Sequence, residues 1–191
     1  MPKLLVLASS PRPKGNSTIL ALEAARGARD AGAEVKTFRL AKMEIGPCLA
    51  CDGCRKPQAA GCVQKDDMKT LYAELRASDA VLIASPVYWF TMSAQVKLFM
   101  DRLYAFGAES YQPLKGKRVG IILTYGDADP FVSGAVNALR SFQDAFAYVG
   151  APIEGMVYGS ADKPGEVRAN KILMKDSYAL GQKLGAVPCF S

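Results

Sequence analysis

Strand-like and helix-like segments alternate along the whole chain, and this alternation limits the possible folds more than any other feature of the sequence. The first strand-like segment, 3–8, is a continuous apolar run, as in a strand buried on both faces, and each strand-like segment is followed by one of helical composition. Strands are expected at 3–8, 34–40, 80–85, 118–124 and 152–158, and helices at 18–31, 67–78 (capped by Asp66 or Asp67), 94–104, 131–148 and 168–184. This order predicts an α/β fold, a doubly wound parallel sheet with helices on both faces.

With 191 residues, half of them hydrophobic, the chain is long enough for one globular domain with a sizeable core. The domain is expected to span 1–191, with one long irregular insertion, a cysteine-rich loop at about 46–64. The first apolar run is too short for a signal peptide and no run could span a bilayer, so we expect a cytoplasmic protein without membrane contact. The net charge of +6 is scattered without a basic block, which indicates a solvated surface and no nucleic-acid partner.

Four cysteines are concentrated in the irregular loop. Cys48, Cys51 and Cys54 follow one another at two-residue gaps, and Cys62 comes directly after Gly61. Iron–sulfur clusters are held by thiolates in compact runs of this kind, three at the corners of a cube and a fourth that closes it. The spacing therefore predicts a [4Fe–4S] cluster on these four thiols.

Other uses of the thiols stay open. Zinc sites usually have two separate cysteine pairs roughly 12–20 residues apart, whereas these pairs overlap at Cys51, and the chain has no histidine. A disulfide framework is unexpected in a chain of this size without a secretory signal. Redox switching needs only one pair with a two-residue gap. Zinc, redox switching and idle thiols remain as alternatives, and Cys189 is interpreted as an ordinary leftover thiol.

The loop after the first predicted strand has the composition of a phosphate site. In an open parallel sheet, ligands bind beyond the carboxyl ends of the strands. The segment 9–18 offers hydroxyls, the Asn16 amide, a flexible glycine and the N–H groups of a helix N-terminus, with positive charge from Arg12 and Lys14. It lacks the glycine pattern of dinucleotide sites and the Gly-Lys-Ser/Thr sequence of NTPases, so a mononucleotide phosphate fits better. Helix capping alone is the alternative explanation.

The loops after the third and fourth strands are expected to complete this site. The first of them carries Tyr88, Trp89 and Phe90, which could line a flat ring system or instead form a hydrophobic plug or dimer interface. In the second, Gly126 beside Tyr125 would let backbone amides approach the edge of a ligand. No side chain is assigned a catalytic role.

Four motifs of the chain are shared with a known family. They are Ser10-Pro-Arg-x-x-Gly-Asn-Ser17, Pro47-Cys-x-x-Cys-x-x-Cys54, Cys62-Val-x-x-Asp-Asp-Met68, and Ser85-Pro-Val-Tyr88 followed by Met92-Ser93. In these motifs the chain resembles the flavodoxin-like NAD(P)H-dependent FMN reductases, and within them the iron–sulfur flavoproteins of anaerobic microbes. The likeness extends from the first strand to at least Arg102. One departure is Ser9, where relatives usually have glycine.

The resemblance implies a flavodoxin-type sheet with strand order 2-1-3-4-5 and bound FMN. By position in the motifs, the FMN phosphate would be met by Ser10, Arg12, Asn16, Ser17 and Thr18, and the ring and ribityl chain by Pro86, Val87, Tyr88 and Trp89; Tyr125 and Gly126 are assigned from their loop alone. The resemblance also implies a homodimer or homotetramer in which one subunit's cluster lies near another subunit's flavin.

Three functions are compatible with these residues. The leading hypothesis is a redox flavoprotein that relays electrons between FMN and a [4Fe–4S] cluster, with ferredoxin or NAD(P)H as redox partner. The second is an NAD(P)H-dependent FMN or quinone reductase whose cysteine loop is structural, zinc-binding or empty. The third is a non-redox mononucleotide-binding module. Because the chain has no histidine, flavin protonation would depend on water, backbone groups or a tyrosine.

Overall fold

A parallel sheet forms the centre of the protein, as a computed structural model that describes residues 1–187 shows. The parallel strands are β1 (Lys3–Ala8), β2 (Glu34–Arg39), β3 (Ala80–Tyr88), β5 (Arg118–Tyr125) and β6 (Ile153–Ser160), in the order β2-β1-β3-β5-β6. A short sixth strand, β4 (Thr91–Met92), pairs antiparallel with the end of β3. Counted over the parallel strands alone, this is the predicted order 2-1-3-4-5, and the flavodoxin-like fold is confirmed.

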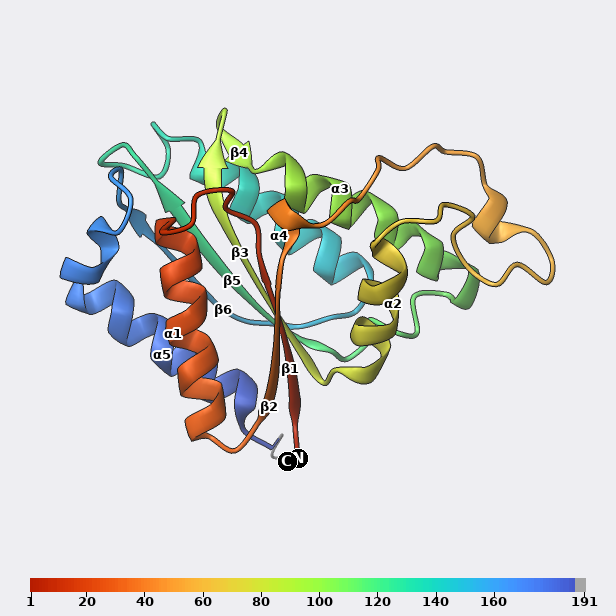
Figure 1. The fold of residues 1–191 in the computed structure, drawn as a ribbon, viewed down its shortest axis with the longest axis horizontal. Helices are drawn as coiled ribbons and strands as arrows, with labels where there is room; N and C mark the ends of the chain where they lie inside the picture. Colours follow the sequence, from red (N-terminus) through yellow and green to blue (C-terminus); the bar gives the residue numbers. More distant parts are fainter. Residues whose placement is uncertain (188–191) are drawn as a thin grey trace.

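Helices cover both faces of the sheet (Figure 1). One face carries α1 (Asn16–Asp30) and α5 (Lys171–Gly185), and the other carries α2 (Met68–Ala77), α3 (Ala94–Arg102) and α4 (Ala135–Tyr148). Short 3-10 helices occupy the connections: η1 (Leu40–Lys42), η2 (Gly53–Arg55), η3 (Leu103–Glu109) and η4 (Glu166–Ala169). The five expected helices are present, but α4 begins later than 131 because Gly134, with φ 74°, precedes its first turn.

The side chains of β1 divide the core into two layers. Leu5 and Leu7 pack in the layer under α2, α3 and α4, whereas Leu4 and Val6 pack in the layer under α1 and α5. Successive side chains of a strand point to opposite faces, so a strand covered on both faces must be apolar at every position. All five residues from Leu4 to Ala8 are buried, which explains the continuous apolar run.

Glycines allow α1 and α5 to lie unusually close together. A Cβ built at Gly181 would lie 1.8 Å from the backbone oxygen of Ala24, and one built at Gly27 would lie 2.2 Å from the backbone oxygen of Tyr178. The two helices therefore touch along their backbones. This contact fixes the position of α1, whose N-terminus lies at the carboxyl edge of the sheet.

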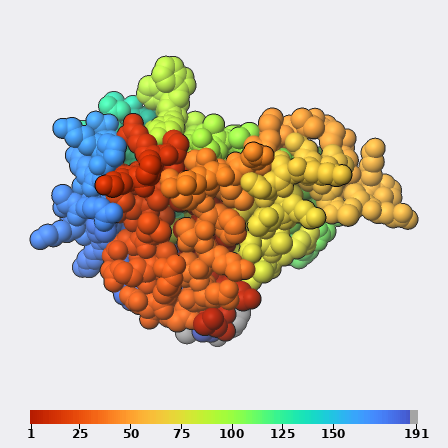
Figure 2. All heavy atoms as spheres, viewed as in Figure 1, coloured from red at the N-terminus to blue at the C-terminus, as the bar shows by residue number. Residues whose placement is uncertain are grey.

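Two segments project from the body of the protein (Figure 2). One is the β3–β4 hairpin. The other is residues 46–66, here called the cysteine segment, which extends beyond α2 and α3 and contains only η2 as regular structure (Figure 1). In the described part of the chain, no helix has both the length and the apolar character needed to cross a bilayer.

Candidate functional site

The carboxyl ends of the central strands open into a cleft of about 240 Å³. Its walls come from four loops: Ser10, Arg12, Gly15 and Asn16 after β1; Pro86, Val87 and Tyr88 at the end of β3; Thr124, Tyr125 and Gly126 at the end of β5; and Ala161, Asp162 and Pro164 after β6. The structure thus brings together the three loops expected from the sequence. The loop after β6, here called the fourth wall, was not predicted from the sequence, because nothing in its local sequence marks it as a ligand loop.

Helix α1 begins beside this cleft with unsatisfied polar groups. Gly15 at the N-cap has no side chain to cap the helix, and the first N–H groups of a helix have no intrahelical partner. The hydroxyls of Ser17 and Thr18 are buried and, among the described residues, have no hydrogen-bond partner. A phosphate would supply the missing acceptor, so these residues fit the terminal phosphate of FMN.

Gly15 also creates room at the turn into α1. A Cβ at this position would lie 2.2 Å from the Ser10 hydroxyl oxygen and 3.3 Å from the backbone oxygen of Arg12. The Ser10 hydroxyl accepts a hydrogen bond from the backbone N–H of Arg12 at 3.3 Å. Only glycine lets the loop fold this tightly against the helix start.

The side chain of Asn16 is fully occupied within the protein. Its Nδ2 donates to the backbone oxygens of Ala161 at 2.9 Å and Lys163 at 3.0 Å. Its Oδ1 accepts from the backbone N–H groups of Gly165 at 3.0 Å and Val167 at 3.3 Å. An asparagine amide has two donor hydrogens and two acceptor lone pairs, and all four are used here. Asn16 therefore fastens the loop after β6 to the first loop, and its side chain has no free donor left for a phosphate.

A hydroxyl bridge joins the first loop to the second. Ser93 donates from its hydroxyl to the Ser9 hydroxyl oxygen at 2.8 Å, and its backbone N–H donates to the Ser85 hydroxyl oxygen at 2.9 Å. All three serines are fully buried. The hydroxyl of Ser9 is thus a link between the two loops that border the cleft.

The β3–β4 hairpin holds the aromatic residues of the second loop. Trp89 and Phe90 form its two-residue turn, both with left-handed φ values of 50° and 65°. Tyr88 lines the cleft, but Trp89 lies at the hairpin tip and is 91% exposed. Contact between Trp89 and the flavin ring therefore requires a ring that extends beyond the described cleft, and it stays a prediction.

Tyr125 is the buried phenol of the cleft. Burial raises its pKa above the ordinary tyrosine value, and the nearby Tyr158 and Asp129 act in the same direction. Tyr125 therefore keeps its proton at neutral pH. Tyr125 lines the cleft, as Tyr88 does, and fits the tyrosine proton source expected for a chain without histidine.

The four cysteines of the cysteine segment are free thiols that differ in exposure. Cys48 and Cys51 are exposed, Cys62 is half-buried and Cys54 is buried. Burial raises the pKa of the Cys54 thiol, and the nearby Cys62 and Cys48 add to the rise. Within residues 1–187, no three His, Cys, Asp or Glu side chains are close enough to hold a metal ion. The donor set has the chemistry of a cluster site, but the segment would have to draw the thiols together to enclose one. Cys189 lies outside the described residues.

Two other hollows differ from the flavin cleft. A cleft of about 760 Å³ lies between residues 60–67, at the end of the cysteine segment, and the helices α2 and η3. Cys62 and Tyr72 are among its lining residues. The N-terminus of α2 is not free there, because Asp66 accepts a hydrogen bond from the Met68 N–H at 3.1 Å, as expected for Asp66. The N-terminus of α2 is therefore not a candidate phosphate site.

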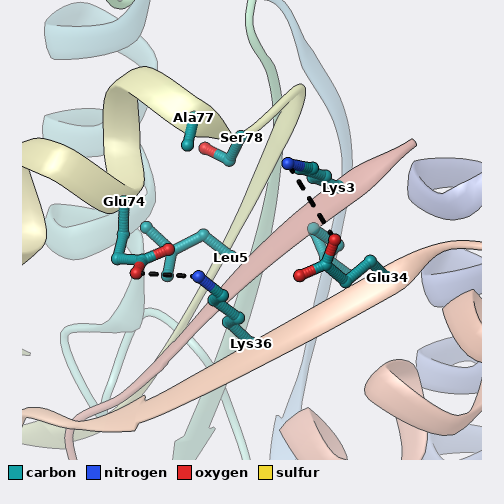
Figure 3. Close-up of a pocket in the computed structure, with 8 residues that line it drawn as sticks. Lys3, Leu5, Glu34, Lys36, Glu74, Ala77 and Ser78 are labelled. Carbon is teal, nitrogen blue, oxygen red and sulfur yellow. Dashed lines mark hydrogen bonds and ion pairs between the residues drawn. The ribbon is translucent and has the colours of Figure 1, made fainter. Parts of the chain in front are cut away.

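The smaller hollow, of about 20 Å³, lies among β1, β2 and α2 (Figure 3). Lys36 and Glu74 form an ion pair across it at 2.9 Å, and Lys3 lies 4.0 Å from Glu34. Its size and its paired charges leave no site for a nucleotide. The cleft at the carboxyl ends of the strands is the candidate flavin site, because it lies beside the uncapped start of α1 and its unpartnered hydroxyls.

Comparisons with known proteins agree with this geometry. Residues 2–162 match the family described as NADPH-dependent FMN reductase. An iron–sulfur flavoprotein of Archaeoglobus fulgidus is 34% identical over 186 residues, which cover 95% of this chain and 78% of the relative. An iron–sulfur flavoprotein of Methanocaldococcus jannaschii is 37% identical over 145 residues, covering 75% and 70% of the two chains. The solved NAD(P)H:quinone oxidoreductase from Methanothermobacter marburgensis shares the fold, with TM-score 0.78, 18% identity and coverage of 99% and 98%.

The fold and the cleft define a flavin-dependent oxidoreductase, and the chain belongs to the NADPH-dependent FMN reductase family. Within that family it falls in the iron–sulfur flavoprotein branch. The predicted resemblance is confirmed, and with it FMN as the cofactor. The family favours a redox protein over the non-redox binding module. The individual FMN contacts and the cluster stay predictions.

Proposed function

We propose that the chain relays electrons between FMN bound in the cleft and a [4Fe–4S] cluster bound by Cys48, Cys51, Cys54 and Cys62. The observation that supports this is a phosphate-type cleft and a projecting segment with four free thiols on one chain. FMN supplies one- and two-electron chemistry when bound, and a cluster exchanges single electrons. Such a protein would connect NAD(P)H with one-electron carriers such as ferredoxin.

Different residues around the cleft bind different parts of FMN. The amides of the first turn of α1 and the hydroxyls of Ser17 and Thr18 bind the phosphate, and exposed Arg12 adds positive charge at the rim. Pro86, Val87 and Tyr88 lie against the ribityl chain and the ring. On the opposite wall Tyr125 holds a proton within the cleft.

The cleft and the cysteine segment lie apart within one chain. They share no lining residue, and the segment projects on the far side of α2 and α3 (Figure 1). A relay is therefore best served by a homodimer or homotetramer in which the segment of one copy approaches the cleft of another. The free thiols are compatible with a reducing compartment such as the cytoplasm.

A second candidate function follows from the thiol positions. Because no three of the thiols are gathered around one point, the chain is also compatible with an NAD(P)H-dependent FMN or quinone reductase whose cysteine segment carries no cluster. In this case Arg12, Ser17 and Tyr88 would play the same parts around FMN. The segment would be structural or would bind zinc.

Anaerobic purification distinguishes the two functions. We expect flavin absorption bands, a broad visible absorption and about four irons with matching sulfide per chain. The control is Cys51→Ala, which should lose the iron and keep the FMN. Flavin bands with zinc, or with no metal, in protein that was never exposed to air would reject the relay and support the reductase.

A further inference from the structure

A buried arginine holds both ends of the cysteine segment. Arg102 is the last residue of α3 and its side chain is 1% exposed. Its Nη1 donates to the backbone oxygen of Gly46 at 3.0 Å and to Asp66 Oδ2 at 2.5 Å. Its Nη2 donates to Asp66 Oδ1 at 3.1 Å and to the Cys62 sulfur at 3.4 Å. One guanidinium thus contacts the start of the segment, its end and one of its four thiols.

Asp66 closes the same contact from the other side. Its Oδ2 accepts from the Gly46 N–H at 3.1 Å, so both backbone groups of Gly46 are held by this ion pair. Burial opposes ionisation of Asp66, but the bonds from Arg102 and from the Gly46 and Met68 amides outweigh it and keep its pKa below the ordinary value. The backbone oxygen of Arg102 accepts from the Tyr72 hydroxyl at 2.7 Å, which anchors the end of α3 to α2.

A buried guanidinium is not what the fold alone would select at this position. Removing an arginine from water is costly even when it is paired, and an apolar side chain of similar size often stabilises a core as well or better. Arg102 Nε is buried and, in the described part of the chain, has no partner. Stability therefore does not explain the arginine, whereas its three contacts with the cysteine segment do.

We propose that Arg102 is the positioning residue of the cysteine segment: it fastens residues 46 and 66 together and fixes the Cys62 sulfur before any metal binds. Fixing the two ends lowers the loop-closure entropy that cluster assembly would otherwise have to overcome. Cys62 would then be the fixed ligand of a cluster, which would also need Cys48, Cys51 and Cys54 to come within reach. The proposal rests on the cysteine half of the proposed function, but the fastening itself exists without metal and is measured without it.

Hydrogen exchange of the metal-free, FMN-loaded protein tests the fastening. In Arg102→Met we expect amides of residues 46–66 to exchange about tenfold faster or more, as loss of a charge-assisted hydrogen bond implies. Iron uptake during anaerobic reconstitution should slow in the same variant. FMN affinity should stay within about twofold of the parent value, because the flavin cleft shares no residue with this contact.

Arg76→Met is the matched control. Arg76 also makes a two-bond pair with a carboxylate, that of Glu109, and stacks on Phe106 at 5.0 Å, but no hydrogen bond joins it to the cysteine segment. Its removal should leave exchange of residues 46–66 and iron uptake unchanged. Arg102→Lys keeps a cation beside Asp66 without the planar guanidinium, so it serves if the unpaired carboxylate destabilises the methionine variant; it should give intermediate exchange and uptake.

The proposal would be overturned if the amides of residues 46–66 exchange at the parent rate in both Arg102 variants. It would also be overturned if Arg102→Met takes up iron at the parent rate. Faster exchange in Arg76→Met as well would also overturn it, because the effect would then be general loosening. A parent protein that takes up no iron, while its segment exchange still depends on Arg102, would reject the electron relay and support the fastening. The two failures are therefore distinguishable.

Discussion

The buried hydroxyl of Ser17 gives a direct test of the phosphate site at the scale of one residue. It has no protein partner among the described residues, so Ser17→Ala removes no internal hydrogen bond. We expect FMN affinity to fall about tenfold, the effect of one hydrogen bond to a charged group. The free energy of unfolding of the FMN-free protein should not fall, because a buried hydroxyl without a partner costs stability and alanine removes it. Fluorescence titration with FMN and urea unfolding measure the two quantities.

Ser177 provides the matched control for this substitution. It is fully buried in α5 and its hydroxyl likewise lacks a partner in the described chain, but its neighbour Tyr178 packs against Gly27, far along α1 from the first turn that holds Ser17. Ser177→Ala should therefore leave FMN affinity unchanged. Equal weakening by both variants, or by neither, would contradict the assignment of Ser17 to the phosphate.

Residue types were easier to predict from the sequence than their partners. The hydroxyls and the glycine of the first loop were expected at the helix start, and they lie there. The four partners of the Asn16 side chain were not foreseen, because they lie about 145 residues or more further along the chain. Short sequence patterns report local geometry and carry no signal for such distant contacts.

At the scale of elements, the close approach of α1 and α5 makes Gly181 critical. Alanine is the better helix former by about 1 kcal/mol, so Gly181→Ala would stabilise an isolated helix. Here the added Cβ would lie 1.8 Å from the backbone oxygen of Ala24, and the helices would have to separate. We expect a net loss of about 2 kcal/mol in the free energy of unfolding, measured by urea titration.

Gln182→Ala is the control for helix propensity alone. Gln182 is the exposed neighbour in the same turn of α5, and its truncation should change the free energy of unfolding by less than ~0.5 kcal/mol. A Gly181→Ala protein as stable as the parent would show that α1 and α5 do not need their backbone contact.

The order of the helices and parallel strands could be predicted from the sequence, whereas their boundaries and the extra strand β4 could not. Apolar runs located the central strands β1, β3 and β5, because a strand buried on both faces has few polar positions. The outer strands β2 and β6 are partly exposed and more polar, and they followed from the alternation of strands and helices. β4 was missed, since two residues carry no periodicity and its turn places Trp89 and Phe90 in left-handed conformations that large side chains rarely adopt. The carboxyl-end cleft was foreseen from topology, but its fourth wall depends on tertiary contacts.

At the scale of the whole molecule, the flavin cleft and the cysteine segment occupy separate regions. The cleft lies at the carboxyl ends of β1, β3 and β5, while the segment projects past α2 and α3 (Figures 1 and 2). Electron transfer slows steeply with distance, so a relay within one chain is disfavoured by this arrangement. A second copy could bring its segment to the cleft without any change of fold.

Transfer between chains predicts that two defective variants restore each other. Cys51→Ala should keep FMN but no cluster, and Gly15→Val should keep the cluster but lose FMN, because its side chain would clash with Ser10. Neither alone can pass electrons from NAD(P)H to a cluster. In an anaerobic mixture we expect loss of the cluster's visible absorption after NAD(P)H is added, since FMN on one chain can reduce the cluster on the other.

Dilution and size measurements complete the test, because the restored activity should disappear where light scattering shows that the chains have separated. Transfer would instead occur within one chain if the parent protein reduces its own cluster at every dilution while the mixture of Cys51→Ala and Gly15→Val never reduces it. The cysteine segment would then have to fold back over the cleft. Such a movement is opposed by the Arg102–Asp66 pair that fastens its ends, so Arg102→Met should speed transfer in that case and only in that case.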